Sequence, residues 1–148
     1  MTAEQYRTFR ELGEEDYAKQ IAESGSMSWE DAVEKSAQDF DDQLPHGLDT
    51  ADQHLRTAYD GDEPVGLLWL RVRTSAQERN AFVNDVMVYE DRRRQGYGRA
   101  IMTAGEELAR RLGASSIGLT VWGGNAGARA LYEQLGYEVT SLQMHKRL

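Results

Sequence analysis

The chain has 148 residues and carries 17 Lys and Arg against 25 Asp and Glu, which gives a formal net charge of −8. This acidic balance argues against general nucleic-acid binding, which uses a basic face. The absence of cysteine excludes disulfides, thiol nucleophiles and cysteine metal sites. No apolar run is long enough to span a bilayer, and no apolar signal region opens the chain. We therefore expect one cytoplasmic domain over residues 1–148, with no membrane partner.

Two amphipathic helices are expected before residue 45. Apolar residues fall on one face of residues 3–24, where Gly13 is a candidate break. Ser28 begins a capping pattern, and apolar residues then repeat at helical spacing until Pro45 ends the segment. Both segments have polar outer faces, so they suit the flank of a domain better than its centre.

Three strands are expected next. Residues 53–59 alternate weakly in polarity, as a half-exposed strand does, and a hairpin turn signal follows at 60–62. The apolar runs 65–72 and 81–88 are typical of central strands.

The last third of the chain alternates helices and strands. Gly98 opens a helix that Gly113 caps, residues 117–121 form a short strand, and Asn125 caps a helix that ends at Leu135. Residues 137–139 and 142–145 are expected to close the chain as a pair of strands. This order predicts an α/β fold with a mixed, mostly antiparallel central sheet flanked by helices.

A turn rich in arginine and glycine separates the strand that ends at Val88 from the helix that Gly98 opens. Its cations are Arg92, Arg93, Arg94 and Arg99, in a chain that is acidic overall. The first N–H groups of a helix have no partner within the helix, and the helix dipole adds partial positive charge there. The turn therefore favours binding of an anion of the phosphate kind.

Spacing excludes two common phosphate motifs. A P-loop needs a Gly-Lys pair, which the sequence lacks. A dinucleotide fingerprint needs a small residue three positions after Gly98, where Ile101 stands. The three histidines, His46, His54 and His145, lie on different expected elements, so no metal site is expected either.

A third pattern fits. Arg93-Arg94-Gln95-Gly96-Tyr97-Gly98 after a strand resembles the pyrophosphate signature of the GNAT superfamily of N-acetyltransferases. Residues 125–137, which read Asn-Ala-Gly-Ala-Arg-Ala-Leu-Tyr-Glu-Gln-Leu-Gly-Tyr, resemble the second signature of the same superfamily. The two signatures occur in the family's order with a strand between them. The resemblance is good over residues 64–148 and loose before that.

The resemblance implies a GNAT-like fold that binds acetyl-CoA as co-substrate. The main chain at Met87 and Val88 would pair with the pantetheine arm, and the turn would hold the pyrophosphate through backbone N–H groups. The implied cofactor-binding residues are Met87, Val88, Arg93, Arg94, Gln95, Gly96, Tyr97, Gly98, Arg99, Asn125 and Ala128. Family members usually begin with a strand, which is short or missing here, and this leaves open whether the sheet edge pairs in a homodimer.

Acetyl transfer to an amine needs a base. An aliphatic amine has a pKa near 10.4, so less than about one part in a thousand is nucleophilic at neutral pH. Asp85, a carboxylate within an apolar strand, is the first candidate for the base. Strand alternation places Asp85 on the face of Val83 and Met87, opposite Asn84 and Val86. A carboxylate satisfied by local hydrogen bonds is an equally weighted alternative.

Tyr132 is the candidate acid. A phenol of pKa near 10 is protonated at pH 7 and can give its proton to a departing thiolate of pKa near 8.5. The resemblance places Tyr132 where the family often has this acid, one helical turn after Ala128. The alternative is a core aromatic whose hydroxyl needs a partner.

The sequence therefore predicts an N-acetyltransferase that acts on a small-molecule or protein amine by direct attack in a ternary complex. A protein that binds or senses acyl-CoA without turnover is the alternative on the same fold. A nucleotide-binding domain is disfavoured by Ile101. The first two helices, which would wall the acceptor site, carry no motif that identifies the amine.

Overall fold

The fold was analysed in a computed structural model, which describes residues 1–146 and 148. The elements are, in chain order, α1 (Ala3–Glu23), α2 (Trp29–Gln43), η1 (Gly47–Asp49), β1 (Gln53–Asp60), β2 (Glu63–Ser75), β3 (Glu78–Val88), η2 (Glu90–Arg92), α3 (Tyr97–Arg111), β4 (Ser116–Leu119) and α4 (Ala126–Gln134). Within the described residues, no helix is both long and apolar enough to cross a bilayer.

The four strands form one sheet in the order β1-β2-β3-β4. The first two pairings are antiparallel, and β4 joins β3 in parallel over Asn80–Val83 and Ser116–Leu119. The predicted mixed, mostly antiparallel sheet with flanking helices is confirmed. The helix α1 begins almost at the start of the chain, and no strand precedes it among the described residues.

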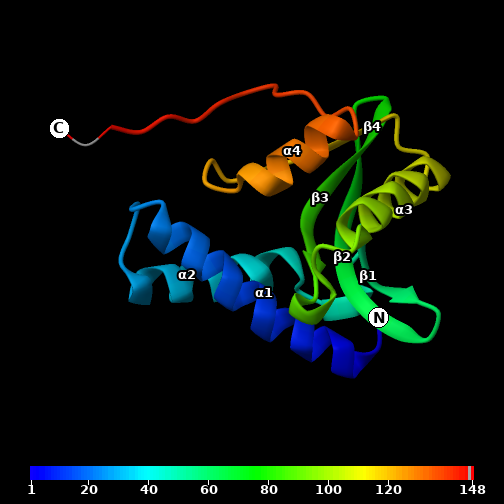
Figure 1. Cartoon of the computed structure of the whole chain (residues 1–148), viewed down its shortest axis with the longest axis horizontal. Coiled ribbons are helices and arrows are strands. Elements are labelled where there is room, and N and C mark those ends of the chain that lie inside the picture. Colours follow the sequence, from blue (N-terminus) through cyan, green and yellow to red (C-terminus); the bar gives the residue numbers. More distant parts are fainter. Residues whose placement is uncertain (147) are drawn as a thin grey trace.

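Helices cover both faces of the sheet (Figure 1). On one face, α1 and α2 pack against β1 and β2 through an aromatic cluster that includes Phe9, Phe40 and Trp69. On the other face, α3 packs against β2 and β3 through Ile101 and Met102. Side chains of α4 extend this second core, so the fold has two apolar layers, one on each side of the sheet.

A β-bulge in β3 changes the predicted alternation. The register shifts between the pairs Trp69–Asp85 and Leu70–Val83, so Asn84 is an extra residue in its strand. Val83 and Val86 pack into the core on the α3 face, whereas the Asn84 amide reaches Gln53 and the Asp85 carboxylate lies beside Gly13 of α1, both on the opposite face. The predicted placement of Asp85 with Val83 was therefore wrong, because a bulge turns two successive side chains to one side.

Gly13 does not break the first helix, which is continuous through it. A Cβ at this position would lie 3.0 Å from Cζ of Phe40 and 3.7 Å from Oδ2 of Asp85. The glycine thus lets α1 approach the aromatic cluster and the bulge closely, which compensates for its low helix propensity.

The expected strand pair at the end of the chain is not formed. Residues 137–146 are extended without strand pairing and leave the body of the molecule (Figure 1). Val139, Leu142 and Met144 are exposed, so their apolar pattern has no sheet to join in this chain. A strand needs a neighbouring strand for its hydrogen bonds, and the apolar pattern alone does not supply one.

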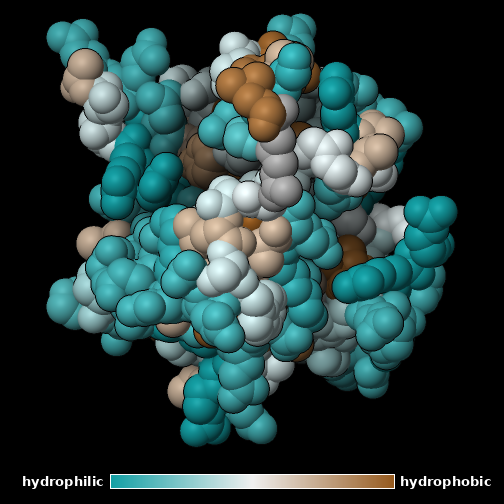
Figure 2. All heavy atoms as spheres, turned by 90° about the vertical axis from the view of Figure 1, so that its left-hand side faces the viewer, coloured by the Kyte–Doolittle hydropathy of each residue, from teal (hydrophilic) through white to brown (hydrophobic). Residues whose placement is uncertain are grey.

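The surface seen in Figure 2 is mostly hydrophilic, with small separate hydrophobic patches. This agrees with a net charge of −8 and with the polar outer faces expected for α1 and α2.

Candidate active site

The site begins where two parallel strands separate. The ladder between β3 and β4 ends at the pair Val83–Leu119, yet β3 continues to Val88. Beyond this pair, the β4 side of β3 has no strand partner among the described residues. Free main-chain N–H and C=O groups at such an edge can pair with an extended ligand as with another strand.

A groove of about 630 Å³ follows this open edge. It continues over the arginine turn to the first turn of α3, and α1 and α4 form its sides. The predicted cofactor-binding residues that line it are Met87, Val88, Arg93, Arg94, Gly96, Tyr97, Gly98, Asn125 and Ala128. Residues separated by forty positions in the sequence therefore share one groove.

The turn presents backbone donors to this groove. Gly96 has φ +86° and Arg94 has φ +63°, so the chain turns sharply before α3 begins. The first α3 bond runs from the N–H of Ala100 to the carbonyl of Gly96, which leaves the preceding N–H groups of the helix without helical partners. No side chain caps α3 and no acid lies in its first turn, whereas α2 has both Ser28 and two acids there. Its partial positive charge is therefore left for a ligand.

Four predicted side chains of the turn already form hydrogen bonds, and one of them, Arg93, donates from Nε to the carbonyl of Val88 at 3.3 Å. The Tyr97 hydroxyl donates to Asp60 at 2.7 Å, and Arg99 donates to the side chain of Gln134. The Gln95 amide donates to a main-chain carbonyl at 3.4 Å. Gln95 and Arg99 lie outside the groove lining, so a role for them through their main-chain N–H groups stays a prediction.

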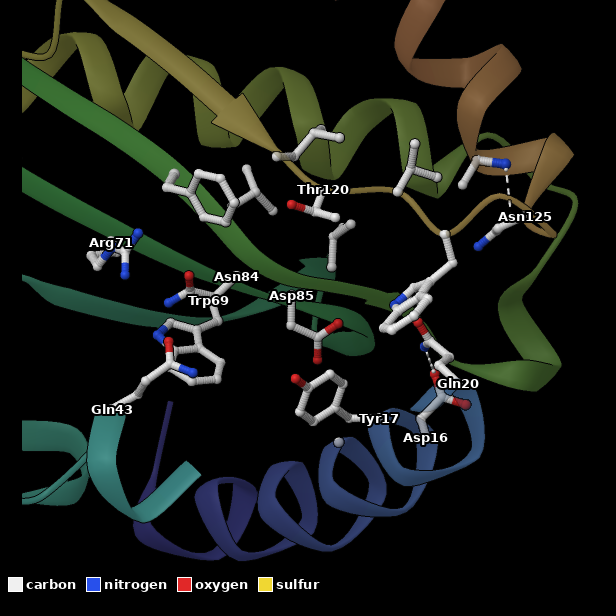
Figure 3. Close-up of a pocket in the computed structure, with 18 of the residues that line it drawn as sticks. Asp16, Tyr17, Gln20, Gln43, Trp69, Arg71, Asn84, Asp85, Thr120 and Asn125 are labelled. Atoms are coloured by element: carbon white, nitrogen blue, oxygen red, sulfur yellow. Dashed lines mark hydrogen bonds between the residues drawn. The ribbon is translucent and has the colours of Figure 1, made fainter. Parts of the chain in front are cut away.

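A second cavity, of about 430 Å³, opens beside the groove between α1, the sheet and α4 (Figure 3). The two spaces share the lining residues Asp16, Asp85, Val86, Asn125 and Ala128. A molecule in the cavity and a molecule in the groove would therefore meet at Asp85. The volume suits a small ligand or a single side chain of a larger one.

Asp85 is a perturbed carboxylate at this junction. Burial raises its pKa to about 6, with a further contribution from the negative charge of Asp16, and the N–H of Val86 opposes the rise. A carboxylate with a pKa near 6 is mostly ionised at neutral pH and is still basic enough to accept a proton. The bulge places Asp85 at this junction, because in a strand without the extra residue Asn84 the Asp85 side chain would lie on the same face as Val83.

Tyr132 reaches the same cavity from α4. Asn125 caps this helix by accepting a hydrogen bond from the N–H of Ala128 at 3.1 Å, as predicted. Burial, followed by the nearby charge of Asp85, raises the pKa of the Tyr132 phenol. The phenol therefore stays protonated throughout the neutral range. The two predicted catalytic side chains lie close enough to interact electrostatically.

The cavity also contains residues that the sequence did not reveal. They are Asp16, Tyr17 and Gln20 from α1, Gln43 from α2, and Trp69 and Arg71 from β2. One signal was available in α1, where a helix-interior glycine at 13 continues into the polar residues 16, 17 and 20 at helical spacing. A polar extension of a buried helical stripe indicates a face that looks into a cavity.

A hydrogen-bonded group stabilises the cavity wall. The indole Nε1 of Trp69 donates to Oε1 of the buried Gln53 at 2.6 Å, and the amide of Asn84 donates to the same oxygen at 3.4 Å. The bulge residue is thereby tied across β2 to Gln53 of β1, which restrains the adjacent Asp85.

Comparison with known proteins agrees with this geometry. The model of the acetyltransferase (GNAT) family matches residues 14–137. Two proteins of Bacillus subtilis strain 168, named uncharacterized N-acetyltransferases YdgE and YycN, are 32% and 34% identical over 149 residues. These alignments span 100% of this chain and 95% and 96% of the two relatives. A mycothiol acetyltransferase of Propionibacterium freudenreichii is 34% identical over 80% of this chain and 36% of its own length.

Solved structures show the same architecture. The crystal structure of Bacillus subtilis YycN superposes with a TM-score of 0.95 at 34% identity, and covers 100% of this chain and 95% of that one. A Pyrococcus furiosus protein has a TM-score of 0.65 at 24% identity over 90% of this chain and 93% of its own, which shows likeness of fold alone.

Proposed function

Because the chain belongs to the GNAT family of acetyltransferases, we propose that it transfers an acetyl group from acetyl-CoA to a primary amine by direct attack in a ternary complex. The observation that carries the proposal is the meeting of groove and cavity at Asp85. One space suits an extended, phosphorylated ligand and the other a small polar one, and a base with a pKa near 6 lies between them.

The groove residues fit acetyl-CoA. Main-chain N–H groups at the start of α3 would hold the pyrophosphate, with Arg93 and Arg94 beside them. A Cβ at Gly98 would come within 3.3 Å of Leu131 Cδ2 and 3.8 Å of Val88 Cγ2, so the glycine keeps α4 close to the floor of the groove. The open edge of β3 would pair with the amide groups of the pantetheine arm.

Acetyl-CoA supplies a thioester carbonyl and a thiolate leaving group. Asp85 accepts the proton that an incoming ammonium must lose before it becomes nucleophilic, directly or through a water molecule. The raised pKa of Tyr132 keeps the proton on its phenol at neutral pH, so the phenol can donate this proton to the sulfur as the carbon–sulfur bond of the thioester breaks. The base and the acid thus have pKa values on opposite sides of neutrality, as proton transfer at pH 7 requires.

The first test is binding. Acetyl-CoA at about 100 times its dissociation constant should stabilise the protein by about 2.7 kcal/mol. At about 2–4 °C per kcal/mol for a chain of this size, the melting temperature should rise by several degrees. ATP and NAD at the same concentration are the controls, and equal shifts with all three would contradict a specific acetyl-CoA groove.

The second test is turnover. Release of free thiol from acetyl-CoA should accelerate with at least one member of a panel of primary amines. Binding without thiol release from any amine would instead support the alternative, an acyl-CoA-binding or sensing protein on the same fold.

A further inference from the structure

The cavity beside Asp85 has oppositely charged groups at different ends. Asp85 and Asp16 lie where the cavity meets the groove, and Arg71 lies away from that junction (Figure 3). Among the described lining residues, Arg71 is the only cation. Because Arg71 lines the cavity and not the groove, its charge belongs to whatever binds there rather than to the cofactor.

The Arg71 guanidinium has no counter-ion of its own among the described residues. Burial, and then the nearby charge of Arg73, lower its pKa, and no carboxylate opposes them. Arg10 is arranged differently, because it forms ion pairs with Glu14 and Asp41. A guanidinium that has lost part of its hydration and has no protein counter-ion can form a charge-assisted hydrogen-bond pair with an anionic ligand without first breaking an ion pair.

Local packing keeps this guanidinium ready for a ligand. Its Cζ lies 5.2 Å from the centre of the Phe82 ring, on the neighbouring strand. Stacking on an aromatic ring orients the planar group and leaves its N–H edge free to donate in pairs to a carboxylate. The amides of Asn84 and Gln43 lie at the same end of the cavity and can add neutral hydrogen bonds.

The strand register fixes the approximate distance between the two charged ends. Arg71 pairs with Phe82, three positions before Asp85 on β3. Because Asn84 is an extra residue, these positions span only the two that separate Arg71 from Trp69, the partner of Asp85. At about 3.3 Å per residue and about 4.8 Å between strands, the two side chains lie roughly 8 Å apart at their roots. A ligand with an amine at Asp85 and an anion at Arg71 would therefore have several bonds between its two groups.

On the basis of the proposed acetyl transfer, we propose that the acceptor is a small primary amine with a carboxylate at its other end, and that Arg71 binds this carboxylate. A singly charged carboxylate is favoured over a doubly charged phosphate. Asp16 and Asp85 already contribute negative charge to the same cavity, and one guanidinium cannot neutralise a dianion.

The test uses pairs of probes that differ only in charge. The 4-, 5-, 6- and 8-carbon ω-aminoalkanoates are compared with the corresponding ω-aminoalkanamides, which have nearly the same shape but no negative charge. The wild-type protein should prefer the best acid over its amide by about tenfold or more in kcat/KM, as expected of a charge-assisted hydrogen-bond pair. The preference should appear mainly in KM.

Arg71→Gln should reduce this acid-to-amide ratio to about two or less. Arg71→Lys, which retains a charge but not the planar fork, should give an intermediate ratio. Arg73→Gln is the matched control, because it removes the same charge from the same strand at an exposed position that does not line the cavity. It should retain the wild-type ratio. An unchanged melting shift with acetyl-CoA would show that each variant is folded.

Equilibrium binding separates this inference from the proposed function. Calorimetry with the wild type saturated with CoA should detect binding of the ω-aminoalkanoates, and Arg71→Gln should lower their binding affinity by about tenfold. Carboxylate-selective binding without turnover would retain the Arg71 site and overturn the acetyltransferase. Any of four results would overturn the inference. They are turnover without carboxylate selectivity, equal effects of Arg71→Gln and Arg73→Gln, absence of probe binding, and preference for an ω-aminoalkyl phosphate.

Discussion

The groove and the cavity are neighbouring spaces built in different ways. The groove is made largely of main chain, namely the open edge of β3, a turn with two residues at positive φ and the uncapped start of α3. The cavity is made of side chains that α1, α2, β2, β3, α4 and the segment after β4 bring together. Main-chain sites bind a feature that many ligands share, whereas side-chain sites can change identity by single substitutions.

The comparison implies that chemistry and selectivity depend on individual side chains in the cavity and that cofactor binding does not depend on any one side chain in the groove. Four substitutions test this difference: first two in the cavity, with large expected effects on kcat, and then two in the turn, with small expected effects on acetyl-CoA affinity.

Asp85→Asn should have the largest effect. Loss of the base should lower kcat by about 10³-fold, within the range of general base catalysis. In the wild type, kcat should rise with pH through about 6, where Asp85 loses its proton, and the Asn variant should lack this rise. Asp16→Asn should move the rise to lower pH, because Asp16 helps to raise the pKa of Asp85. Initial rates between pH 5 and 9 measure both effects, and an unaltered pH profile in Asp85→Asn would exclude this carboxylate as the base.

The same substitution should stabilise the fold. The pKa of Asp85 is about 6 in the folded protein against an ordinary 3.8, so the folded state binds the proton more tightly than the unfolded state. The free energy of unfolding therefore falls as pH rises from about 4 to 6 and is lowest above that range. Allowing for partial exposure, we expect Asp85→Asn to add about 2 kcal/mol at pH 8 and little at pH 4. Thermal unfolding at the two pH values measures the difference.

Tyr132→Phe should have the next largest effect. Removal of the phenolic proton donor should lower kcat by about 10²-fold, with little change in KM for acetyl-CoA. The pKa of Tyr132 lies above its ordinary value, so this residue should produce no alkaline fall in rate below about pH 10. Tyr137→Phe is the matched control, since its ring packs 5.9 Å from that of Tyr132 and lines neither space. Full activity in Tyr132→Phe would assign the thiolate's proton to solvent.

The same difference explains how far the sequence alone could reach. The groove was predictable because its glycines, arginines and cap lie in two short motifs, and most of their predicted residues line it. The cavity was not predictable from the sequence, because residues such as Asp16, Trp69 and Arg71 come together only when α1 packs on the sheet. The bulge at Asn84 could not be predicted, because nothing in the strand pattern marks an extra residue. The prediction of a strand pair after Gly136 was wrong, because a strand needs a neighbouring strand to pair with, and an apolar pattern does not specify one.

Arg94→Gly should have the smallest effect on cofactor binding, and its two consequences should have opposite signs. Arg94 adopts φ +63°, a region that is unfavourable for residues with a Cβ, so glycine should stabilise the fold by about 0.5–1 kcal/mol. Loss of one exposed guanidinium should weaken acetyl-CoA binding only about threefold to tenfold, because the main-chain N–H groups of the turn remain.

Gly96→Ala is the opposite change at the same turn, because it adds a Cβ at a position with positive φ and removes no charge. No atom lies within 4 Å of the added Cβ, so the cost arises from φ +86° alone and should be about 1 kcal/mol. Acetyl-CoA affinity should fall further than in Arg94→Gly although no charge is lost, because the altered turn re-aims the N–H groups. Melting curves with and without acetyl-CoA measure stability and affinity together. If Arg94→Gly abolished binding and Gly96→Ala left it intact, the phosphate would be held by guanidinium groups, and the groove would be a side-chain site like the cavity.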